Sequence, residues 1–288
     1  MTQVGAIEGG GTWFRAAVGT PDGHIRASVR LPTTEPDGVV EQITAFFEER
    51  GPVAAVGVGC FGPLRLDPTA PDYGALLNTP KPAWRAYPLG ARLQTRLGCP
   101  LVFETDVGAA AWGELHHGAG RGCESLVYVT IGTGVGAGLV AGGRIVHGRL
   151  HPEAGHMRVP RRADDPFDGV CPHHGDCVEG RVSGPALAAR WGRPAESLPA
   201  GHPAWDEAAR VIGQLVHNLS LTLAPDRVIL GGGVAQAPGL LDGVRRVFDE
   251  LEGGYRAGFT GDPHVVAAGC GDQAALRGGL ILAGARPL

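Results

Sequence analysis

Cysteine and histidine residues gather within residues 156–177, where their types and spacing suggest a metal site. Cys171, His174 and Cys177 lie on one short loop, and His156 can return as a fourth ligand. Thiolate and imidazole groups at such separations are typical of a tetrahedral zinc ion. Four protein ligands leave no open coordination position, so we expect a structural Zn²⁺ and not a Lewis acid.

Two other interpretations of this loop remain open at this point. Cys171 and Cys177 can form a disulfide, or the segment can be a polar surface loop. The N-terminal residues lack the basic and apolar regions of a secretory signal, so we expect a cytoplasmic protein, and a reducing cytosol disfavours the disulfide. Spacing alone does not decide whether His173 or His174 binds the ion, because adjacent histidines cannot both point at it.

Two acidic residues lie close to the expected ligands. Glu153 comes three residues before His156, and Glu179 comes two residues after Cys177. A bound ion would fix both carboxylates in space, which suits recognition of sugar hydroxyls because charge-assisted hydrogen bonds are strong. The alternative is that both acids are solvated loop residues.

The composition is that of a globular protein, and it excludes several classes of function. The chain has 288 residues, of which 43% are hydrophobic and 19% charged, enough for one large or two medium domains. A net charge of −4 and the lack of a Lys/Arg cluster argue against a nucleic-acid partner. No apolar run is long enough to span a membrane. The 48 glycines indicate backbone that approaches a ligand closely.

The elements that must position these residues occur in two similar series. Each series opens with a strand, a glycine turn and two more strands, which predicts a topological duplication and two lobes. The N-terminal lobe is expected to span residues 1–115, completed by a helix in 272–288; the C-terminal lobe, with the zinc loop 156–177, is expected to span 116–271. The predicted strands are 4–7, 15–19, 24–31, 54–59, 101–104, 125–131, 137–141, 144–147, 227–230 and 264–268. The predicted helices are 37–50, 89–97, 106–117, 185–191 and 204–223, with two more beginning near 239 and 273.

Three glycine-rich turns follow strand ends in this pattern. Consecutive backbone N–H groups in such turns form concave sites for anions, which indicates a nucleoside triphosphate bound across a cleft between the lobes. None is a Walker A loop, since no Gly-Lys-Ser/Thr occurs. Thr12 and Thr133 add hydroxyl donors, and Glu8 beside phosphates implies a Mg²⁺ ion between them. The turns comprise Gly9, Gly10 and Gly11; Gly132, Gly134 and Gly136; and Gly231, Gly232 and Gly233.

These motifs resemble those of the ROK family of bacterial sugar kinases and repressors, and within it the fructokinase branch. The resemblance covers essentially the whole chain, and the zinc segment is its most specific part. It implies an α/β fold of the two-lobed, actin-like ATPase (ribonuclease H-like) type with an inter-lobe active-site cleft, ATP and Mg²⁺ as co-substrates, a hexose acceptor and a homodimer. The matching motifs are IEGGGT at 7–12, FGP at 61–63, TPKP at 79–82, TDV at 105–107, TIGTG at 130–134, HPEAGH at 151–156, CPHHGDC at 171–177, SGP at 183–185 and ILGGGV at 229–234.

Carried over position by position, the resemblance implies roles for individual residues. Asp106 would be the catalytic base and would accept the proton of the 6-hydroxyl of D-fructose as that oxygen attacks the γ-phosphorus. Local sequence alone favours an N-cap at Asp106 instead, because Asp often caps helices. The implied sugar-binding residues are Thr105, Gly108, Glu153, His156 and Glu179. The implied nucleotide-binding residues are Glu8, Gly9, Gly10, Gly11, Thr12, Thr130, Gly132, Thr133, Gly134, Gly231, Gly232 and Gly233, and the implied zinc ligands are His156, Cys171, His174 and Cys177.

The chain departs from the family pattern at two positions. Trp13 stands where the family has a lysine, and Gly108 stands where it has an asparagine. With glycine, a sugar hydroxyl loses an amide donor, so that water or another residue must fill the gap. Gly108→Asn is therefore expected to lower the KM for the sugar. Neither departure affects the expected base or the metal site.

The expected function is that of an ATP-dependent fructokinase. The alternatives are a kinase for mannose, glucose or an N-acetylhexosamine, a catalytically weak sugar-binding protein, and a sugar-responsive transcription regulator of the same family. A regulator needs a DNA-binding segment, and a first strand near Val4 leaves no room for one before it. Release of ADP on addition of sugar separates the enzyme from the other two.

Overall fold

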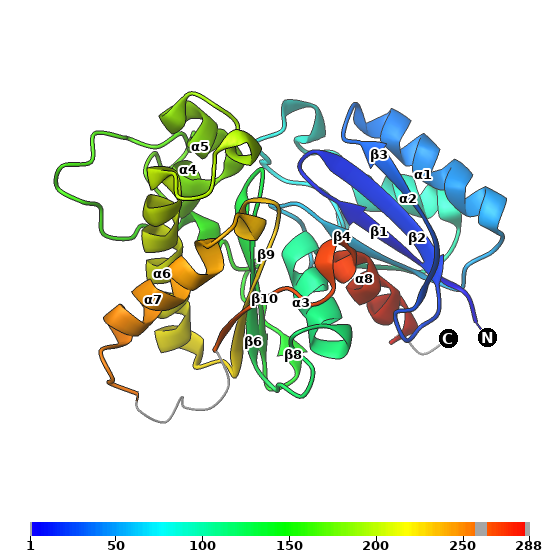
Figure 1. Cartoon of the computed structure of the whole chain (residues 1–288). Helices are drawn as coiled ribbons and strands as arrows, with labels where there is room; N and C mark the ends of the chain where they lie inside the picture. Colours follow the sequence, from blue (N-terminus) through cyan, green and yellow to red (C-terminus); the bar gives the residue numbers. More distant parts are fainter. Residues whose placement is uncertain (1, 257–263, 286–288) are drawn as a thin grey trace. The chain divides into compact units, whose positions relative to one another are not determined.

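The computed structural model describes residues 2–256 and 264–285 and divides into two compact units, each built on a five-stranded mixed sheet (Figure 1). The first unit contains Met1–Arg121, Ile145–Pro152 and Gly269–Leu288, and the second contains Gly122–Arg144 and Glu153–Ala268. Residues 116–121, 145–152 and 269–271, which the sequence pattern assigned to the C-terminal lobe, therefore group with the first unit. Residues 286–288 of the predicted terminal segment lie outside the described residues.

The sheet of the first unit has the strand order β3-β2-β1-β4-β5. β1 pairs antiparallel with β2, which pairs antiparallel with β3; β1, β4 and β5 run parallel. The strands are β1 (Val4–Gly9), β2 (Trp13–Gly19), β3 (Ile25–Pro32), β4 (Val56–Cys60) and β5 (Leu101–Thr105). The helices are α1 (Pro36–Arg50), α2 (Leu89–Leu97), α3 (Asp106–His117) and α8 (Ala274–Gly284), with a 3₁₀ turn η1 (Pro82–Trp84).

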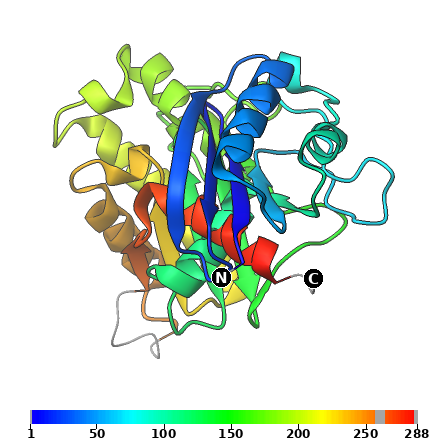
Figure 2. The ribbon, with the colours of Figure 1, turned by 90° about the vertical axis from the view of Figure 1, so that its right-hand side faces the viewer.

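Two cores form on this sheet, because successive residues of a strand point to opposite faces. Ile7 of β1 belongs to the core under α1 and α2, together with Phe14 and Phe47. Its neighbour Ala6 faces the other way and packs in a smaller cluster with Leu280 of α8. Figure 2 shows α8, in red, alongside the strands of this sheet. The alternation of β1 therefore fixes which helices cover which face.

The sheet of the second unit repeats the strand order of the first, as β8-β7-β6-β9-β10. β6 pairs antiparallel with β7 and parallel with β9, as β1 does with β2 and β4. This equivalence confirms the topological duplication predicted from the sequence. The strands are β6 (Leu126–Ile131), β7 (Val135–Ala141), β8 (Arg144–Ile145), β9 (Arg227–Gly231) and β10 (Val265–Ala267). The helices are α4 (Val178–Val182), α5 (Gly184–Trp191), α6 (Pro203–Leu223) and α7 (Leu240–Glu252), with 3₁₀ turns η2 (Ala154–His156), η3 (Ala195–Ser197) and η4 (Val234–Gln236).

The core of the second unit forms around α6. Its buried residues recur every three or four positions, as in Ala208, Ile212, Leu215 and Leu219, which is the pattern of an amphipathic helix on a sheet. Among the helices of residues 2–256 and 264–285, none combines the length and the apolar character needed to cross a membrane.

Most predicted elements are present, with three differences. α1 begins at Pro36 with Glu35 as its N-cap, so Asp37 is not the cap but an acid in the first turn. β8 has two residues where four were predicted. α4 was not predicted, because a helix of five residues is too short to show a hydrophobic period.

Candidate active site and metal centre

Asp106 lies at the junction of β5 and α3 in the first unit. Thr105 is the N-cap of α3, and its Oγ1 accepts a hydrogen bond from the N–H of Gly108 at 2.9 Å. Asp106 is the first residue of the helix, and its Oδ1 accepts a hydrogen bond from the N–H of Val107 at 2.9 Å. The N-cap role that local sequence favoured for Asp106 is therefore wrong. Among the described residues, Oδ2 of Asp106 has no hydrogen-bond partner, so it can accept a proton from a ligand.

The surroundings of Asp106 make its carboxylate more basic than usual. Burial raises the pKa of Asp106 to about 6; the N–H of Val107 opposes the shift, and the charge of Glu104 adds to it. Such a carboxylate is still ionised at neutral pH, yet it takes up a proton more readily than an exposed Asp. This is the balance that a general base requires.

Glu104, which the sequence pattern did not single out, is buried beside this junction. Its Oε1 accepts hydrogen bonds from the N–H of Thr105 at 2.7 Å and from its Oγ1 at 3.1 Å. Nε2 of His147 lies 2.8 Å from Oε2 of Glu104, and this hydrogen bond raises the pKa of His147 against the effect of burial. An acidic residue in a buried strand, next to Thr-Asp, was a usable signal for Glu104. His147 lies in a loop whose sequence gave no such signal.

The space beside Gly108 is filled. A Cβ at Gly108 would lie 2.4 Å from Oε1 of Glu104 and 2.8 Å from Oγ1 of Thr105. Of the two possibilities expected from the sequence, water or another residue, the structure shows the second, because the Glu104 carboxylate occupies the space. A side chain at this position must displace a buried, hydrogen-bonded carboxylate.

A second group of charged side chains lies at the end of β1. Nη1 of Arg15 is 3.6 Å from Oε2 of Glu8, and Nη2 of Arg15 is 3.4 Å from Asp272. Oε2 of Glu8 is buried and accepts no hydrogen bond from the described residues. Burial raises the pKa of Glu8 to about 7, with Arg15 opposing and the charges of Asp106 and Asp272 adding to the shift. Two carboxylates face a single guanidinium here, and such an oxygen-rich site with excess negative charge fits a hard cation such as Mg²⁺.

The glycine turn between β1 and β2 is held by backbone and side-chain contacts. The N–H of Gly10 donates to the carbonyl of Trp13 at 2.9 Å, and Lys81 donates to the carbonyl of Gly11. The guanidinium carbon of Arg30 lies over the Trp13 ring, 4.0 Å from its centroid, so Trp13 packs against Arg30 on the surface of the sheet. The implied nucleotide-binding residues of this turn are Glu8, Gly9, Gly10, Gly11 and Thr12.

The other two glycine turns lie side by side at the C-terminal ends of β6 and β9, two neighbouring inner strands of the second sheet. β6 and β9 are parallel neighbours, in which Thr130 pairs with Gly231. Gly232 has a φ of 87°, and a Cβ there would lie 2.3 Å from a backbone oxygen of β6, so the position requires glycine. The N–H of Gly184, in the first turn of α5, donates to the carbonyl of Gly132 at 2.7 Å. Turns and a helix start grouped in this way suit phosphate groups. The implied nucleotide-binding residues brought together here are Thr130, Gly132, Thr133, Gly134, Gly231, Gly232 and Gly233.

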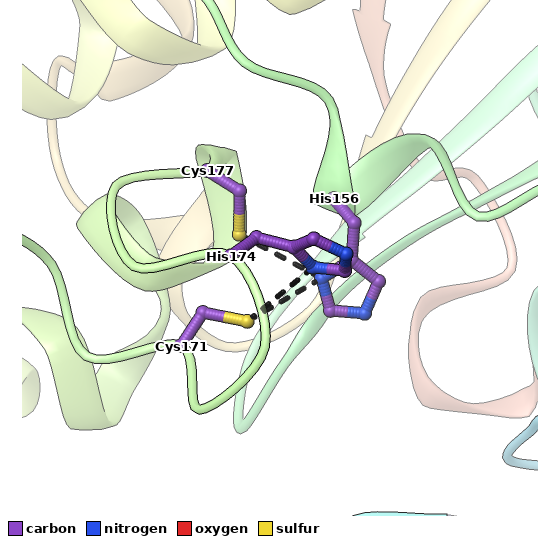
Figure 3. A group of neighbouring side chains, drawn as sticks. All are labelled: His156, Cys171, His174 and Cys177. Carbon is purple, nitrogen blue, oxygen red and sulfur yellow. Dashed lines mark hydrogen bonds between the residues drawn. The ribbon is translucent and has the colours of Figure 1, made fainter.

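The four predicted metal ligands converge in the second unit (Figure 3). Nδ1 of His156 lies 3.7 Å from Sγ of Cys171 and 3.6 Å from Sγ of Cys177, and Nδ1 of His174 lies 3.7 Å from Sγ of Cys171. Zinc–sulfur and zinc–nitrogen bonds of ~2.3 and ~2.0 Å at the tetrahedral angle separate these atoms by about 3.5 Å. The donor set and its spacing therefore fit Zn²⁺, with His174, and not His173, as the ligand.

Local backbone structure brings these ligands together. Cys171 and Gly175 exchange backbone hydrogen bonds of 2.9 and 3.2 Å, which close a tight loop. Cys177 is the N-cap of α4, and its Sγ accepts a hydrogen bond from the N–H of Gly180 at 3.4 Å. His156 ends the 3₁₀ turn η2. All six cysteines are free, so the alternative of a disulfide between Cys171 and Cys177 is wrong.

The two carboxylates near the metal centre differ in their surroundings. Glu179 lies in the first turn of α4, and its Oε2 accepts a hydrogen bond from the N–H of Val135 at 3.0 Å, directly after the β6–β7 glycine turn. Glu153 is exposed at the start of η2. The helix that Cys177 caps therefore also contacts the glycine turn through Glu179.

A buried ion-pair network holds α4 in place. The side chain of Arg181 is fully buried, and its Nη2 lies 2.7 Å from Glu207 and 3.7 Å from Asp165. Arg190 donates to the Asp165 carboxylate through both terminal guanidinium nitrogens, from Nη2 at 2.9 Å and from Nη1 at 3.1 Å. Because buried charges need such partners, this network ties α4 to α5, α6 and the loop between His156 and Cys171.

The comparison with known protein families decides the identity of the chain. A model described as "ROK family" matches residues 4–286. The chain belongs to the ROK family. It is 38% identical to the fructokinase of Pediococcus pentosaceus, over 97% of both chains. It is 39% identical to the fructokinase of Zymomonas mobilis, over 97% of this chain and 95% of that one.

Solved structures of ROK proteins share the fold. The ROK hexokinase of Thermus thermophilus superposes with a TM-score of 0.79 at 27% identity, over 98% of both chains. A ROK family glucokinase from Streptomyces griseus, solved in complex with glucose and AMPPNP, gives a TM-score of 0.76 at 28% identity, over 98% of this chain and 99% of that one. These matches and the duplicated sheets confirm the α/β fold of the two-lobed, actin-like ATPase class.

Proposed function

We propose that this ROK protein is an ATP-dependent fructokinase that transfers the γ-phosphoryl group of ATP to the 6-hydroxyl of D-fructose. Relatives named fructokinase, at 37–39% identity over most of the chain, make it a sugar kinase and support fructose as the acceptor. The single structural observation that carries the proposal is the Asp106 carboxylate, placed at the start of α3 with one oxygen held and the other available.

In the proposed reaction Asp106 acts as the general base. It accepts the proton of the 6-hydroxyl while the sugar oxygen forms a bond to the γ-phosphorus and the bond from phosphorus to the β–γ bridging oxygen breaks, leaving ADP. A pKa of about 6 suits this step, because the carboxylate is ionised before the transfer and releases the proton to water afterwards. Thr105 supports the base by capping α3 and fixing its first turn.

The nucleotide is proposed to bind through its phosphates at the glycine turns. Glu8 and Asp272 would hold the Mg²⁺ ion, which when bound neutralises charge on the phosphates. The turns after β6 and β9 would supply backbone donors to the same groups. Sugar hydroxyls would be bound by Thr105, Glu153, His156 and Glu179.

The metal centre is proposed to hold a structural zinc ion. His156, Cys171, His174 and Cys177 would bind it and leave no open position for substrate. Its function is to fix α4 and thereby Glu179. We also expect a homodimer in solution, and a cytoplasmic enzyme, since its co-substrate ATP is found there.

A coupled assay of ADP release tests the function. Wild-type protein is expected to release ADP with fructose at a higher kcat/KM than with mannose, glucose or N-acetylglucosamine. Asp106→Asn is expected to lower kcat by about two to four orders of magnitude with the KM for ATP nearly unchanged. Asp249→Asn, an exposed substitution on α7, is the control for loss of a carboxylate elsewhere. A higher kcat/KM with glucose would favour a glucokinase, as in the Streptomyces relative, and no ADP release with any hexose would contradict the proposal.

A further inference from the structure

The pair of Glu104 and His147 takes no part in the proposed reaction, and its two members differ in exposure. The Glu104 side chain is 4% exposed, whereas that of His147 is 37% exposed. A carboxylate removed from water needs donors, and Glu104 has two from Thr105, at 2.7 and 3.1 Å, and one from Nε2 of His147, at 2.8 Å. The Glu104 carboxylate is thus hydrogen-bonded within the protein, while part of the His147 side chain is exposed to solvent.

The contact with Glu104 determines which ring atom of His147 is available. Nε2 faces a carboxylate and therefore carries the hydrogen, which leaves Nδ1 for another partner. Among the described residues, Nδ1 of His147 has no hydrogen-bond partner. The carboxylate also raises the pKa of His147, which favours the imidazolium, and in that form Nδ1 is a donor. The ring therefore offers a ligand an acceptor when neutral and a donor when charged.

The fold holds this pair beside Asp106. Glu104 comes two residues before Asp106, and its carboxylate packs against Gly108 in the first turn of α3. His147 follows β8, and its segment is also fixed by Nε2 of His151, which accepts a hydrogen bond from a backbone N–H of the loop after β4 at 3.0 Å. His147 is therefore anchored at the β5–α3 junction by its own contact with Glu104, and its segment is held to the loop after β4 by His151.

We propose that His147 contacts a hydroxyl group of the sugar acceptor through Nδ1 and so contributes to sugar specificity, and that Glu104 is its positioning residue. The proposal rests on the proposed function, in which the sugar lies against Asp106. A polyhydroxylated ring is the ligand chemistry that fits, since a hydroxyl donates to a neutral imidazole or accepts from an imidazolium. Gly108 belongs to the same arrangement, because only a residue without a side chain leaves room for the Glu104 carboxylate.

Three substitutions of His147 separate contact with the sugar from support of Glu104. His147→Ala removes both, His147→Gln places an amide nitrogen near the position of Nε2, and His147→Asn places one near that of Nδ1. For the alanine and glutamine variants we expect the KM for fructose to rise about tenfold, with kcat and the KM for ATP changed less than twofold. The asparagine variant is expected to recover part of the affinity for fructose, although its thermal stability falls. His24→Ala, in the exposed β2–β3 turn, is the matched control and should leave every parameter unchanged.

Equilibrium binding of fructose without ATP, measured by calorimetry on the same variants, distinguishes this proposal from the proposed function. If wild-type protein binds fructose but releases no ADP, only the kinase function fails, and the Kd values of the variants still decide the role of His147. The proposal is overturned if His147→Ala keeps the KM and Kd for fructose within twofold of wild type. Full recovery by His147→Gln also overturns it, because the role would then be only to satisfy Glu104. If wild-type protein neither binds nor phosphorylates any hexose, both proposals fail.

Discussion

Oε2 of Glu179 accepts a hydrogen bond from the N–H of Val135 at 3.0 Å, so the helix that Cys177 caps also holds the glycine turn between β6 and β7. Glu179 thus connects two functions, the metal centre and the proposed phosphate site. Loss of the metal should therefore affect more than the stability of the loop that contains its ligands.

The first prediction concerns removal of the metal. Purified protein should contain about one zinc per chain, and Cys177→Ser should lose it, with a lower Tm and weaker binding of fructose because α4 and Glu179 lose their anchor. Elemental analysis, thermal melting and calorimetry measure the three effects. Cys123→Ser, outside the ligand set, is the control. Unchanged affinity for fructose in zinc-free protein would show that the metal does not position the sugar site.

The second prediction concerns Gly108. Both Gly108→Ala and Gly108→Asn should raise the KM for fructose, since a Cβ would lie 2.4 Å from Oε1 of Glu104 and must displace it from Thr105 and His147. This reverses the direction expected from the sequence, where an asparagine was to restore a missing contact. Gly38→Ala, in the first turn of α1 with open space around it, serves as a control for loss of a glycine. A lower KM in Gly108→Asn would mean that Glu104 moves away at no cost.

The third prediction is a pH dependence due to Asp106. Since its pKa is about 6 and the base must be ionised, kcat/KM for fructose should fall as the pH decreases through about 6. The residual rate of Asp106→Asn should lack this acid limb. Stability should change in the opposite direction. Because the pKa is raised from 3.8 to about 6, the folded protein binds the proton more tightly than the unfolded chain. The contribution of Asp106 to the free energy of unfolding therefore declines as the pH rises from about 4 to about 6. An unchanged acid limb in the Asn variant would assign it to another group.

The fourth prediction concerns Glu114, a fully buried residue of α3. Its carboxylate accepts hydrogen bonds from the N–H groups of Ala119 at 2.7 Å, Gly269 at 3.0 Å and Cys270 at 2.8 Å. Glu114→Ala would remove the buried acceptor of three backbone N–H groups and should lower the free energy of unfolding by about 3 kcal/mol or more, while Glu114→Gln should cost about half as much. Urea denaturation measures both effects. Glu41→Gln, exposed on α1, should change the free energy by less than about 0.5 kcal/mol.

Several features of the site were determined by sequence-local chemistry. The repeated series of strands and glycine turns was predictable, because the period of two in strands and the turn residues are local signals. The cluster of His156, Cys171, His174 and Cys177 was predictable, because Cys-x₂-His-x₂-Cys places three potential donors on one loop. The start of α3 at Asp106 was predicted to the residue, because an acidic residue before an alanine-rich run is a local signal for a helix start.

The tertiary structure decided the features that depend on contacts distant in sequence. His147 meets Glu104 across 43 residues, and no local pattern predicts which loop supplies a partner to a buried acid. The choice of His174 over His173 depends on how the loop closes between Cys171 and Gly175. The sequence shows that residue 108 is a glycine, but it does not show whether the missing side chain leaves a gap. That depends on where the Glu104 carboxylate lies, which only packing in three dimensions determines.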